Sequence, residues 1–378
     1  MNAQPLVDFA PAARLALLAA VIALLPLSWL WSRQRGADTR ARLAALTALT
    51  LFLTFDLVVF GAFTRLTDSG LGCPDWPGCY GQASPFGAHA EIHAAQGILP
   101  AGPVTWNKAW IEMIHRYLAM TVGVLIVVMA AVSWFERRRL PFSPWWPTLT
   151  LVWVIVQGLF GKYTVTLKLY PAVVTLHLLG GLTLLGLLAV QHEAFRRRPL
   201  ELPAGVRGAA FSVLVLLAMQ IALGGWVSSN YAVLACSGFP QCNGSWWPQT
   251  DFAGGFTLLR ELGGVAAHGR PLTLDGLVAI HMAHRFFAIF VALAVALLAW
   301  RLWSADDPVA RRFGLVLALL LLAQLASGLS NVVLSWPLVT ALAHSGGAAA
   351  LLLTLVLLLA RSAAPRRALA GRPYPAAA

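Results

Sequence analysis

Hydrophobic and polar positions follow a coarse pattern, in which apolar runs of about 20 residues recur along the chain with polar connections between them. A helix of that length crosses a hydrocarbon core roughly 30 Å thick. We therefore predict an all-α integral membrane protein. The predicted spans are residues 12–32, 44–65, 110–135, 148–166, 171–194, 208–229, 276–300, 313–334 and 338–360.

Composition supports this fold class, because 59% of the 378 residues are hydrophobic and only 11% are charged, whereas soluble domains carry roughly 25% charged residues. The net charge of +12 does not indicate a nucleic-acid partner, because most basic residues lie between the spans. Of 27 Lys and Arg, 18 fall in residues 33–42, 137–139, 196–207, 301–312 and 361–372. The positive-inside rule makes these segments cytoplasmic.

We expect a bacterial inner membrane protein with its N-terminus and long loops periplasmic and its C-terminus cytoplasmic.

The four cysteines lie in pairs in two long outward connections. Cys73 and Cys79 belong to GCPDWPGC, and Cys236 and Cys242 belong to ACSGFPQC. An even number of thiols on the oxidising side favours two disulfides. Zinc is the less favoured alternative, because each loop supplies only two thiols at a spacing unusual for zinc ligands.

The second half of the chain repeats the first. GAFTRLTDSGLGCPDWPGC (61–79) aligns with GGWVSSNYAVLACSGFPQC (224–242), EMIHRYLA (112–119) with HMAHRFFA (281–288), and QGLFGKYTVTLKLYPAVVTLH (157–177) with QLASGLSNVVLSWPLVTALAH (324–344). We predict two pseudo-symmetric four-helix bundles, residues 36–200 and 201–378, preceded by an extra transmembrane helix in residues 1–35. Because each unit has an even number of spans, the repeat is parallel.

Four histidines lie inside predicted spans, near their outer ends: His115 and His177 in the first half, His284 and His344 in the second. Ionisable groups at such positions are costly and are usually functional. A hydrogen bond between helices would explain one isolated histidine. Two equivalent pairs instead predict a bis-histidine haem site in each half, since histidines on facing helices can hold haem iron from both sides.

An arginine follows one histidine of each pair, Arg116 after His115 and Arg285 after His284. A guanidinium near the outer interface is suited to bind a haem propionate in a bidentate manner. Snorkelling toward lipid headgroups is the alternative. The repetition of the His-Arg pair favours propionate binding.

The two halves differ one turn before this histidine, where Glu112 is matched by His281. Glu112 and His115 are three residues apart and share one face of a helix. A carboxylate beside a haem ligand can exchange protons or stabilise positive charge. The alternative is a structural partner for Arg116 or Lys162. We interpret the asymmetry as one haem site for chemistry and one for electron transfer, with His281 tuning the second haem or serving as an alternative ligand.

In combination, several stretches resemble the haem A synthase family: GAFTRLTDSGLGCPDW, KAWIEMIHRYLA, QGLFGKYTVTLKL with VVTLHLLGG, HMAHRFF and ALAHSGGAA, within residues 44–360. The resemblance implies oxidation of the C8 methyl group of haem O to a formyl group, by successive hydroxylations with oxygen from water. It also implies that one half binds substrate and the other a permanent haem b. His115 and His177 would then flank haem O beside catalytic Glu112, and His284 and His344 would ligate haem b.

The same resemblance implies haem O synthase and an electron acceptor as partners within the lipid bilayer, and it is compatible with a homo-oligomer. Residues 12–32 depart from the eight-helix pattern of the family. Two other functions stay open. A di-haem b-type cytochrome that takes electrons from quinol would bind both haems permanently and would leave Glu112 unexplained. A transporter built on parallel repeats, with histidines as proton relays, would bind no haem.

Overall fold

The structure, a computed structural model, describes residues 10–140, 142–196, 198–263 and 271–362. The predicted positions of the N-terminus and of the C-terminal tail concern residues 1–9 and 363–378, which lie outside these ranges. Within the described residues the fold is helical and contains no β-sheet, apart from two isolated β-bridges in loops.

The described part contains nine helices that are long and apolar enough to cross a membrane, and each contains or overlaps one predicted span. They are α1 (Ala10–Arg33), α2 (Thr39–Leu66), α4 (Trp106–Phe135), α5 (Trp145–Thr166), α6 (Pro171–Arg196), α7 (Ala204–Ser229), α9 (Leu274–Trp303), α10 (Pro308–Val333) and α11 (Leu338–Ser362). Several helices begin earlier than predicted, because Asp38, Thr105, Thr273 and Asp307 cap their first turns with side-chain oxygens. The nine predicted spans are confirmed.

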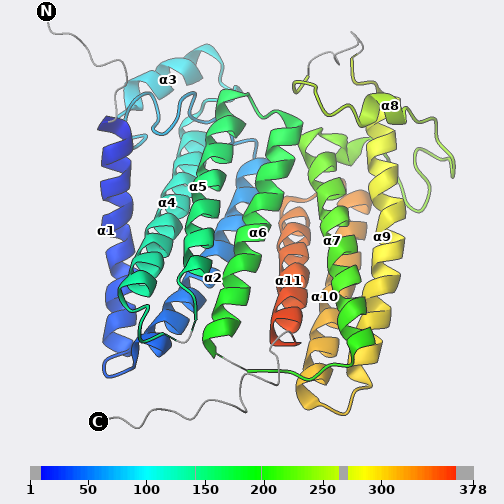
Figure 1. Cartoon of the computed structure of the whole chain (residues 1–378). Coiled ribbons are helices and arrows are strands. Elements are labelled where there is room, and N and C mark those ends of the chain that lie inside the picture. The colour runs from blue at the N-terminus through cyan, green and yellow to red at the C-terminus, as the bar shows by residue number, and fades with distance from the viewer. Residues whose placement is uncertain (1–9, 141, 197, 264–270, 363–378) are drawn as a thin grey trace, which may run out of the picture.

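Three short helices lie in the connections on one side of the molecule: α3 (His89–Ile98), the 3₁₀ helix η1 (Ala232–Leu234) and α8 (Phe252–Gly255). Figure 1 shows α3 and α8 at the same end of the long helices. We call this end, which also carries both cysteine loops, the disulfide end. The opposite end carries the connections with most of the described basic residues.

The long helices pack as two groups of four (Figure 1). In the first group α2, α4, α5 and α6 form a closed ring of neighbours, and in the second α7, α9, α10 and α11 do the same. The groups meet through α6 against α7 and through α11 against α2 and α6. Helix α1 packs on α4 and α2 at the edge of the first group. In each ring, α4 is diagonal to α6 and α9 is diagonal to α11.

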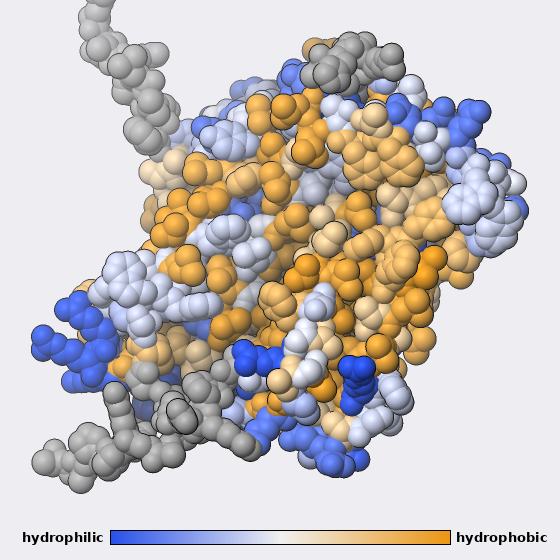
Figure 2. Space-filling model, turned by 45° about the vertical axis from the view of Figure 1, so that its right-hand side comes forward, coloured by the Kyte–Doolittle hydropathy of each residue, from blue (hydrophilic) through white to orange (hydrophobic). Residues whose placement is uncertain are grey.

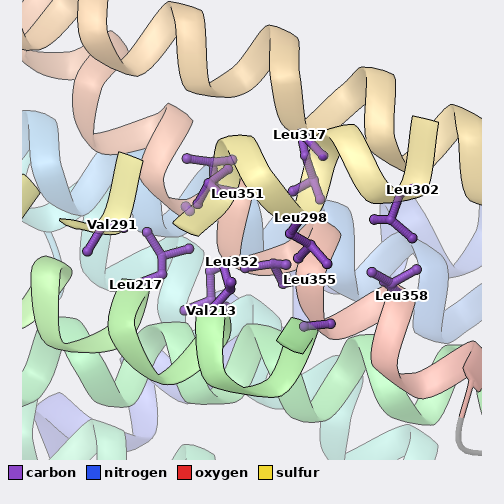
Figure 3. Packing of buried hydrophobic residues seen from close by; sticks show 14 of the residues in the cluster. Val213, Leu217, Val291, Leu298, Leu302, Leu317, Leu351, Leu352, Leu355 and Leu358 are labelled. Atoms are coloured by element: carbon purple, nitrogen blue, oxygen red, sulfur yellow. The ribbon is translucent and has the colours of Figure 1, made fainter. Parts of the chain in front are cut away.

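Leucine and valine side chains from all four helices of the second group fill its interior (Figure 3). Leu217 of α7, Leu298 of α9, Leu317 of α10 and Leu355 of α11 are each at most 4% exposed. Lipid is as apolar as this interior, so the hydrophobic effect does not drive helices together within a bilayer. Close packing of this kind stabilises their association instead. In α9 and α11 these leucines lie one or more turns further from the disulfide end than the histidines do.

The outward faces of the long helices are also apolar. Leu25 of α1, Phe290 of α9 and Leu319 of α10 are 72%, 64% and 56% exposed. Figure 2 shows apolar side chains across the middle of one face and hydrophilic ones toward both ends. An exposed apolar surface of this extent is what lipid contact requires.

Candidate haem-binding sites

The predicted histidine ligands come from diagonally placed helices in each group of four. His115 lies on α4 and His177 on α6, and His284 lies on α9 and His344 on α11. Each histidine is six to ten residues from the helix end nearest the disulfide end. The members of each pair lie close enough to interact electrostatically. The structure thus brings together the pairs that the sequence predicted.

Each of these histidine rings packs against a glycine of the preceding long helix. The contacts are Gly61 with His115, Gly161 with His177, Gly224 with His284 and Gly328 with His344. A β-carbon would lie 3.0 to 3.1 Å from the nearest ring atom at three of these positions, and 3.6 Å from it at Gly161. These glycines were not predicted from the sequence. They occupy equivalent positions of the repeat, because Gly61 aligns with Gly224 and Gly161 with Gly328, so the repeat could have identified them.

Polar contacts to the rings differ between the halves. In the second half the Gln220 side-chain nitrogen lies 3.1 Å from Nδ1 and 3.4 Å from Nε2 of His284. The Ser327 hydroxyl lies 3.1 Å from Nδ1 of His344. In the first half, Nδ1 of His177 is buried and has no hydrogen-bond partner among the described residues.

Glu112 is buried, with 4% of its surface exposed, and both of its carboxylate oxygens are engaged. Its Oε2 accepts a 2.8 Å hydrogen bond from the Cys73 backbone N–H. Its Oε1 forms an ion pair with Arg116, one turn further along α4. The structural partnership with Arg116, weighed as an alternative, is therefore present, while a catalytic role for Glu112 stays a prediction.

The arginine of the first half holds the loop between Cys73 and Cys79. Arg116 Nη1 donates to the backbone carbonyls of Asp75 and Pro77, at 2.9 and 3.2 Å, and to that of Gly78. Its Nη2 is taken up by the ion pair described above. Sequence reasoning missed this use of the guanidinium because the loop lies about 40 residues away along the chain.

Arg285 repeats the arrangement in the second half, more weakly. It donates to the carbonyls of Gly238 and Gln241, at 3.2 and 3.4 Å, and these positions align with Asp75 and Gly78. Its Nε is buried and has no partner within the described ranges. Propionate binding stays a prediction for both arginines, and the buried, unpaired Nε of Arg285 is a donor that could serve it.

Both predicted disulfides are present, Cys73–Cys79 and Cys236–Cys242. An antiparallel bridge closes each loop, between Cys79 and Gln82 and between Cys242 and Ser245. The prediction of disulfides over zinc is confirmed.

His281, the counterpart of Glu112, is also tied to its outer segment. It is 4% exposed, and its Nδ1 lies 3.0 Å from the carbonyl oxygen of Ala232 in η1. Both residues at this repeat position therefore contact the connection that follows the first helix of their group. The proposed tuning of a haem by His281 stays a prediction.

The residues fit a haem held from both sides in each half. Paired imidazoles project from diagonal helices, and glycines leave room beside them where a β-carbon would intrude. His177 Nδ1 and Arg285 Nε are buried polar atoms that lack partners in the described residues. Across the same residues, no three His, Cys, Asp or Glu side chains cluster as a metal site.

Comparison with known proteins identifies close similarity over both groups of helices. Residues 44–356 match the COX15-CtaA family model, described as cytochrome oxidase assembly protein. The chain is 40% identical over 319 residues to the "Heme A synthase" of Shewanella oneidensis, covering 82% of this chain and 93% of that protein. It is 28% identical to the protein of that name from Shouchella clausii, over 77% of this chain and 86% of the relative. Helix α1 lies outside the residues matched by the family model.

Proposed function

Because the chain belongs to the haem A synthase (COX15-CtaA) family of membrane oxidoreductases, we propose that it oxidises the C8 methyl group of haem O to a formyl group, which yields haem A. Haem O is the substrate, bound between His115 and His177. Haem b is the resident cofactor, bound between His284 and His344. The observation that carries this assignment is the buried Glu112 one turn from His115, at the position where the other half has His281.

We further propose that residues 36–200 and 201–378 are parallel repeats, preceded by the extra helix in residues 1–35. Contacts between equivalent residues support a two-fold axis along the membrane normal. Arg65 Nη2 donates to the carbonyl of Ser228 at 2.5 Å, and the Tyr231 hydroxyl donates to Asp68 at 2.6 Å. Both pairs are separated by the shift of 163 that relates residue 61 to residue 224. Equivalent residues can contact each other only close to such an axis.

The conversion of methyl to formyl proceeds through two hydroxylations and the loss of one water molecule from the resulting gem-diol. With water as the oxygen source, each hydroxylation releases two electrons and two protons. Glu112 is placed to take a proton from water or to stabilise positive charge at the reacting carbon. Haem b would supply one-electron chemistry when bound. His284 and His344 would hold its iron, and Arg285 Nε, which has no partner among the described residues, could donate to a propionate.

The electrons leave to an external acceptor, and haem O synthase is the expected source of substrate. We place the protein in a bacterial inner membrane with the disulfide end periplasmic, because the basic connections lie at the other end. Disulfides in both loops of that end fit an oxidising compartment.

Purified Glu112→Gln protein tests the catalytic assignment. Glutamine keeps one oxygen that can accept from the Cys73 N–H, while the base and the ion pair with Arg116 are removed. We expect haem b content to match wild type and haem A formation from supplied haem O to fall at least 10²-fold, the usual contribution of a general base. Pyridine haemochrome spectra and chromatography of extracted haems measure both quantities.

Glu91→Gln on α3 is the matched control, and this variant should form haem A at the wild-type rate because Glu91 is exposed. Normal haem A formation by Glu112→Gln would remove the catalytic role. His284→Ala should deplete haem b, and unchanged haem b content would contradict the ligand assignment. A wild-type sample that holds haem b alone and never converts haem O would favour the di-haem cytochrome, and one without any haem would favour the transporter.

A further inference from the structure

The two histidine pairs differ in what holds their rings in place. In the second half, Gln220 of α7 lies beside His284, with its side-chain nitrogen 3.1 Å from Nδ1 and 3.2 Å from the histidine's own carbonyl oxygen. Ser327 of α10 contacts Nδ1 of His344 at 3.1 Å. Each contact comes from the helix whose glycine also packs against that ring. Both rings of this half are thus fixed by a polar group and a close backbone.

The first half has apolar residues at the equivalent positions. By the shift that aligns Gly61 with Gly224, Gln220 corresponds to Leu57, and by the shift that aligns Gly161 with Gly328, Ser327 corresponds to Phe160. Neither side chain can form a hydrogen bond. Accordingly, Nδ1 of His177 is buried without a partner among the described residues. The nearest aromatic neighbour of His115 is Phe60, with ring centroids 6.4 Å apart.

A second glutamine, Gln324 on α10, shows that the difference between the halves concerns the contacts to the histidine ring nitrogens. Gln324 donates a 2.9 Å hydrogen bond to the backbone carbonyl of His344. Its counterpart Gln157 occupies the same place in the first half, where it contacts Gly180, as Gln324 contacts Gly347. The two halves therefore share the packing of a glutamine against a glycine, and in the second half that glutamine also holds the helix backbone. Among the described residues, Gln220 and Ser327 are the polar side chains that lie within hydrogen-bond distance of a ring nitrogen of the four paired histidines.

We propose that Gln220 and Ser327 are positioning residues that fix the rings of His284 and His344, and that this asymmetry makes the C-terminal site retain its haem while the N-terminal site exchanges it. The inference rests on the proposed function, which places a bis-histidine haem site in each half. Iron bound at Nε2 leaves Nδ1–H to a hydrogen-bond acceptor, which fixes the tautomer and ring orientation and raises the basicity of the ligand.

Both side chains have an oxygen for this purpose. The Ser327 hydroxyl is already at Nδ1 of His344. The Gln220 side-chain oxygen is buried and has no partner in the described residues. A half-turn of the amide exchanges the nitrogen's 3.2 Å contact with the His284 carbonyl for a hydrogen bond that the oxygen accepts from His284 Nδ1–H. A ring that is oriented before haem binds loses less rotational freedom on binding, and its complex is correspondingly tighter. A substrate site benefits from the opposite property, because its product must leave.

The test replaces each residue in the purified full-length protein. Gln220→Leu introduces the type of residue found at position 57, and Ser327→Ala removes the hydroxyl. We expect haem b to transfer to apomyoglobin about tenfold faster in each variant, within the 10- to 100-fold range typical for the loss of a hydrogen bond to a metal-ligating histidine. The midpoint potential should rise, because a less basic imidazole stabilises ferric iron less. Ser327→Thr, which keeps the hydroxyl, should restore both values.

Matched controls lie on the same helices. Met219→Leu changes a neighbour of Gln220 that is 51% exposed, and Ser330→Ala removes a hydroxyl that bonds only within α10, to Ala326. Both should keep the wild-type transfer rate and potential. If Gln220→Leu or Ser327→Ala fails to fold, the reciprocal variant Phe160→Ser carries the test, and it should slow the release of haem from the first half.

The possible failures are distinguishable. Wild-type protein that contains no haem b would refute the proposed function itself. Wild-type protein that contains haem b, with an unchanged transfer rate and potential in Gln220→Leu and Ser327→Ala, would overturn the positioning role and leave the proposed function standing. Unchanged release from Phe160→Ser would overturn it as well.

Discussion

At the scale of single residues, glycines determine how closely the histidine rings approach the neighbouring helices. Gly224 has its α-carbon so near His284 that an added β-carbon would lie 3.0 Å from the ring. This is closer than the 3.5 to 4.0 Å at which carbon atoms attract each other. An added β-carbon would come similarly close to the ring at Gly61 and at Gly328. The positions of these rings therefore require a residue without a side chain on the neighbouring helix.

Gly224→Leu should therefore push the His284 ring from its place and deplete haem b to a small fraction of the wild-type content. The pyridine haemochrome spectrum of the purified protein measures this. Gly208→Leu is the matched control on the same helix, because a β-carbon at Gly208 meets no atom within 4 Å. Equal haem b content in the two variants would show that the ring tolerates displacement.

The sequence predicted the histidine pairs and the cysteine pairs, but not the partners of the charged residues between them. A repeat reveals which residues are equivalent, and lipid makes an ionisable residue conspicuous. Neither consideration tells where a side chain points. Arg116 was expected to bind propionate, and its contacts with Asp75 and Gly78 depend on how a distant loop folds back over α4. Such contacts are set by tertiary structure and leave no periodic signal.

At the scale of elements, the spans were the easiest feature to predict and the loops the hardest. A bilayer requires continuous apolar helices, since unpaired backbone groups are costly there, and all nine predicted spans are present in the described residues. The connections at the disulfide end follow no such constraint. Helices α3, α8 and η1 were not predicted, because they are short and their surroundings decide their conformation.

The two cysteine loops should differ in how readily they open. Arg116 is buried and binds three carbonyls of its loop as well as Glu112, whereas Arg285 makes two longer hydrogen bonds. Arg116→Ala should speed the reduction of Cys73–Cys79 by dithiothreitol at least about tenfold, since hydrogen bonds to a charged group contribute about 1.5–3 kcal/mol. Arg285→Ala should have a smaller effect on Cys236–Cys242.

Alkylation followed by mass spectrometry of each loop peptide measures both rates in one sample. The disulfide of the other loop is the internal control, and Arg116→Ala should leave the reduction of Cys236–Cys242 unchanged. Equal acceleration at both disulfides would mean that the substitution loosens the whole disulfide end.

At the scale of the whole molecule, one cluster joins the two groups of helices where they meet at the disulfide end. Arg65 forms a 3.1 Å ion pair with Asp68, and its guanidinium lies 4.0 Å from the centre of the Tyr231 ring. The Tyr231 hydroxyl donates to Asp68 from the opposite half. Burial, followed by this hydrogen bond, raises the pKa of Tyr231 above its ordinary value.

Tyr231→Phe should lower the melting temperature by about 1 to 2 °C at pH 8, because a hydrogen bond contributes about 1 kcal/mol and the shift per kcal/mol falls with chain length. The raised pKa means that folding favours the neutral phenol. The contribution of the Tyr231 hydroxyl to the free energy of unfolding is therefore complete below a pH of about 10. It is lost as the pH rises through the pKa of Tyr231 in the folded state. Thermal unfolding in detergent across this range measures the difference, and phenylalanine keeps the ring beneath Arg65.

A difference between wild type and Tyr231→Phe that persists unchanged at the highest pH would contradict this account. It would show that the difference does not come from the hydrogen bond that the Tyr231 hydroxyl donates to Asp68.

The equal depth of the two histidine pairs has an energetic consequence for the proposed reaction. Both pairs lie six to ten residues from the disulfide end of their helices. An electron that moves from one pair to the other travels along the plane of the bilayer. The membrane potential, which contributes about 2.3 kcal/mol per charge for each 100 mV crossed, then neither drives nor opposes that transfer. The equilibrium of that one transfer would therefore be the same in an energised and in a de-energised membrane.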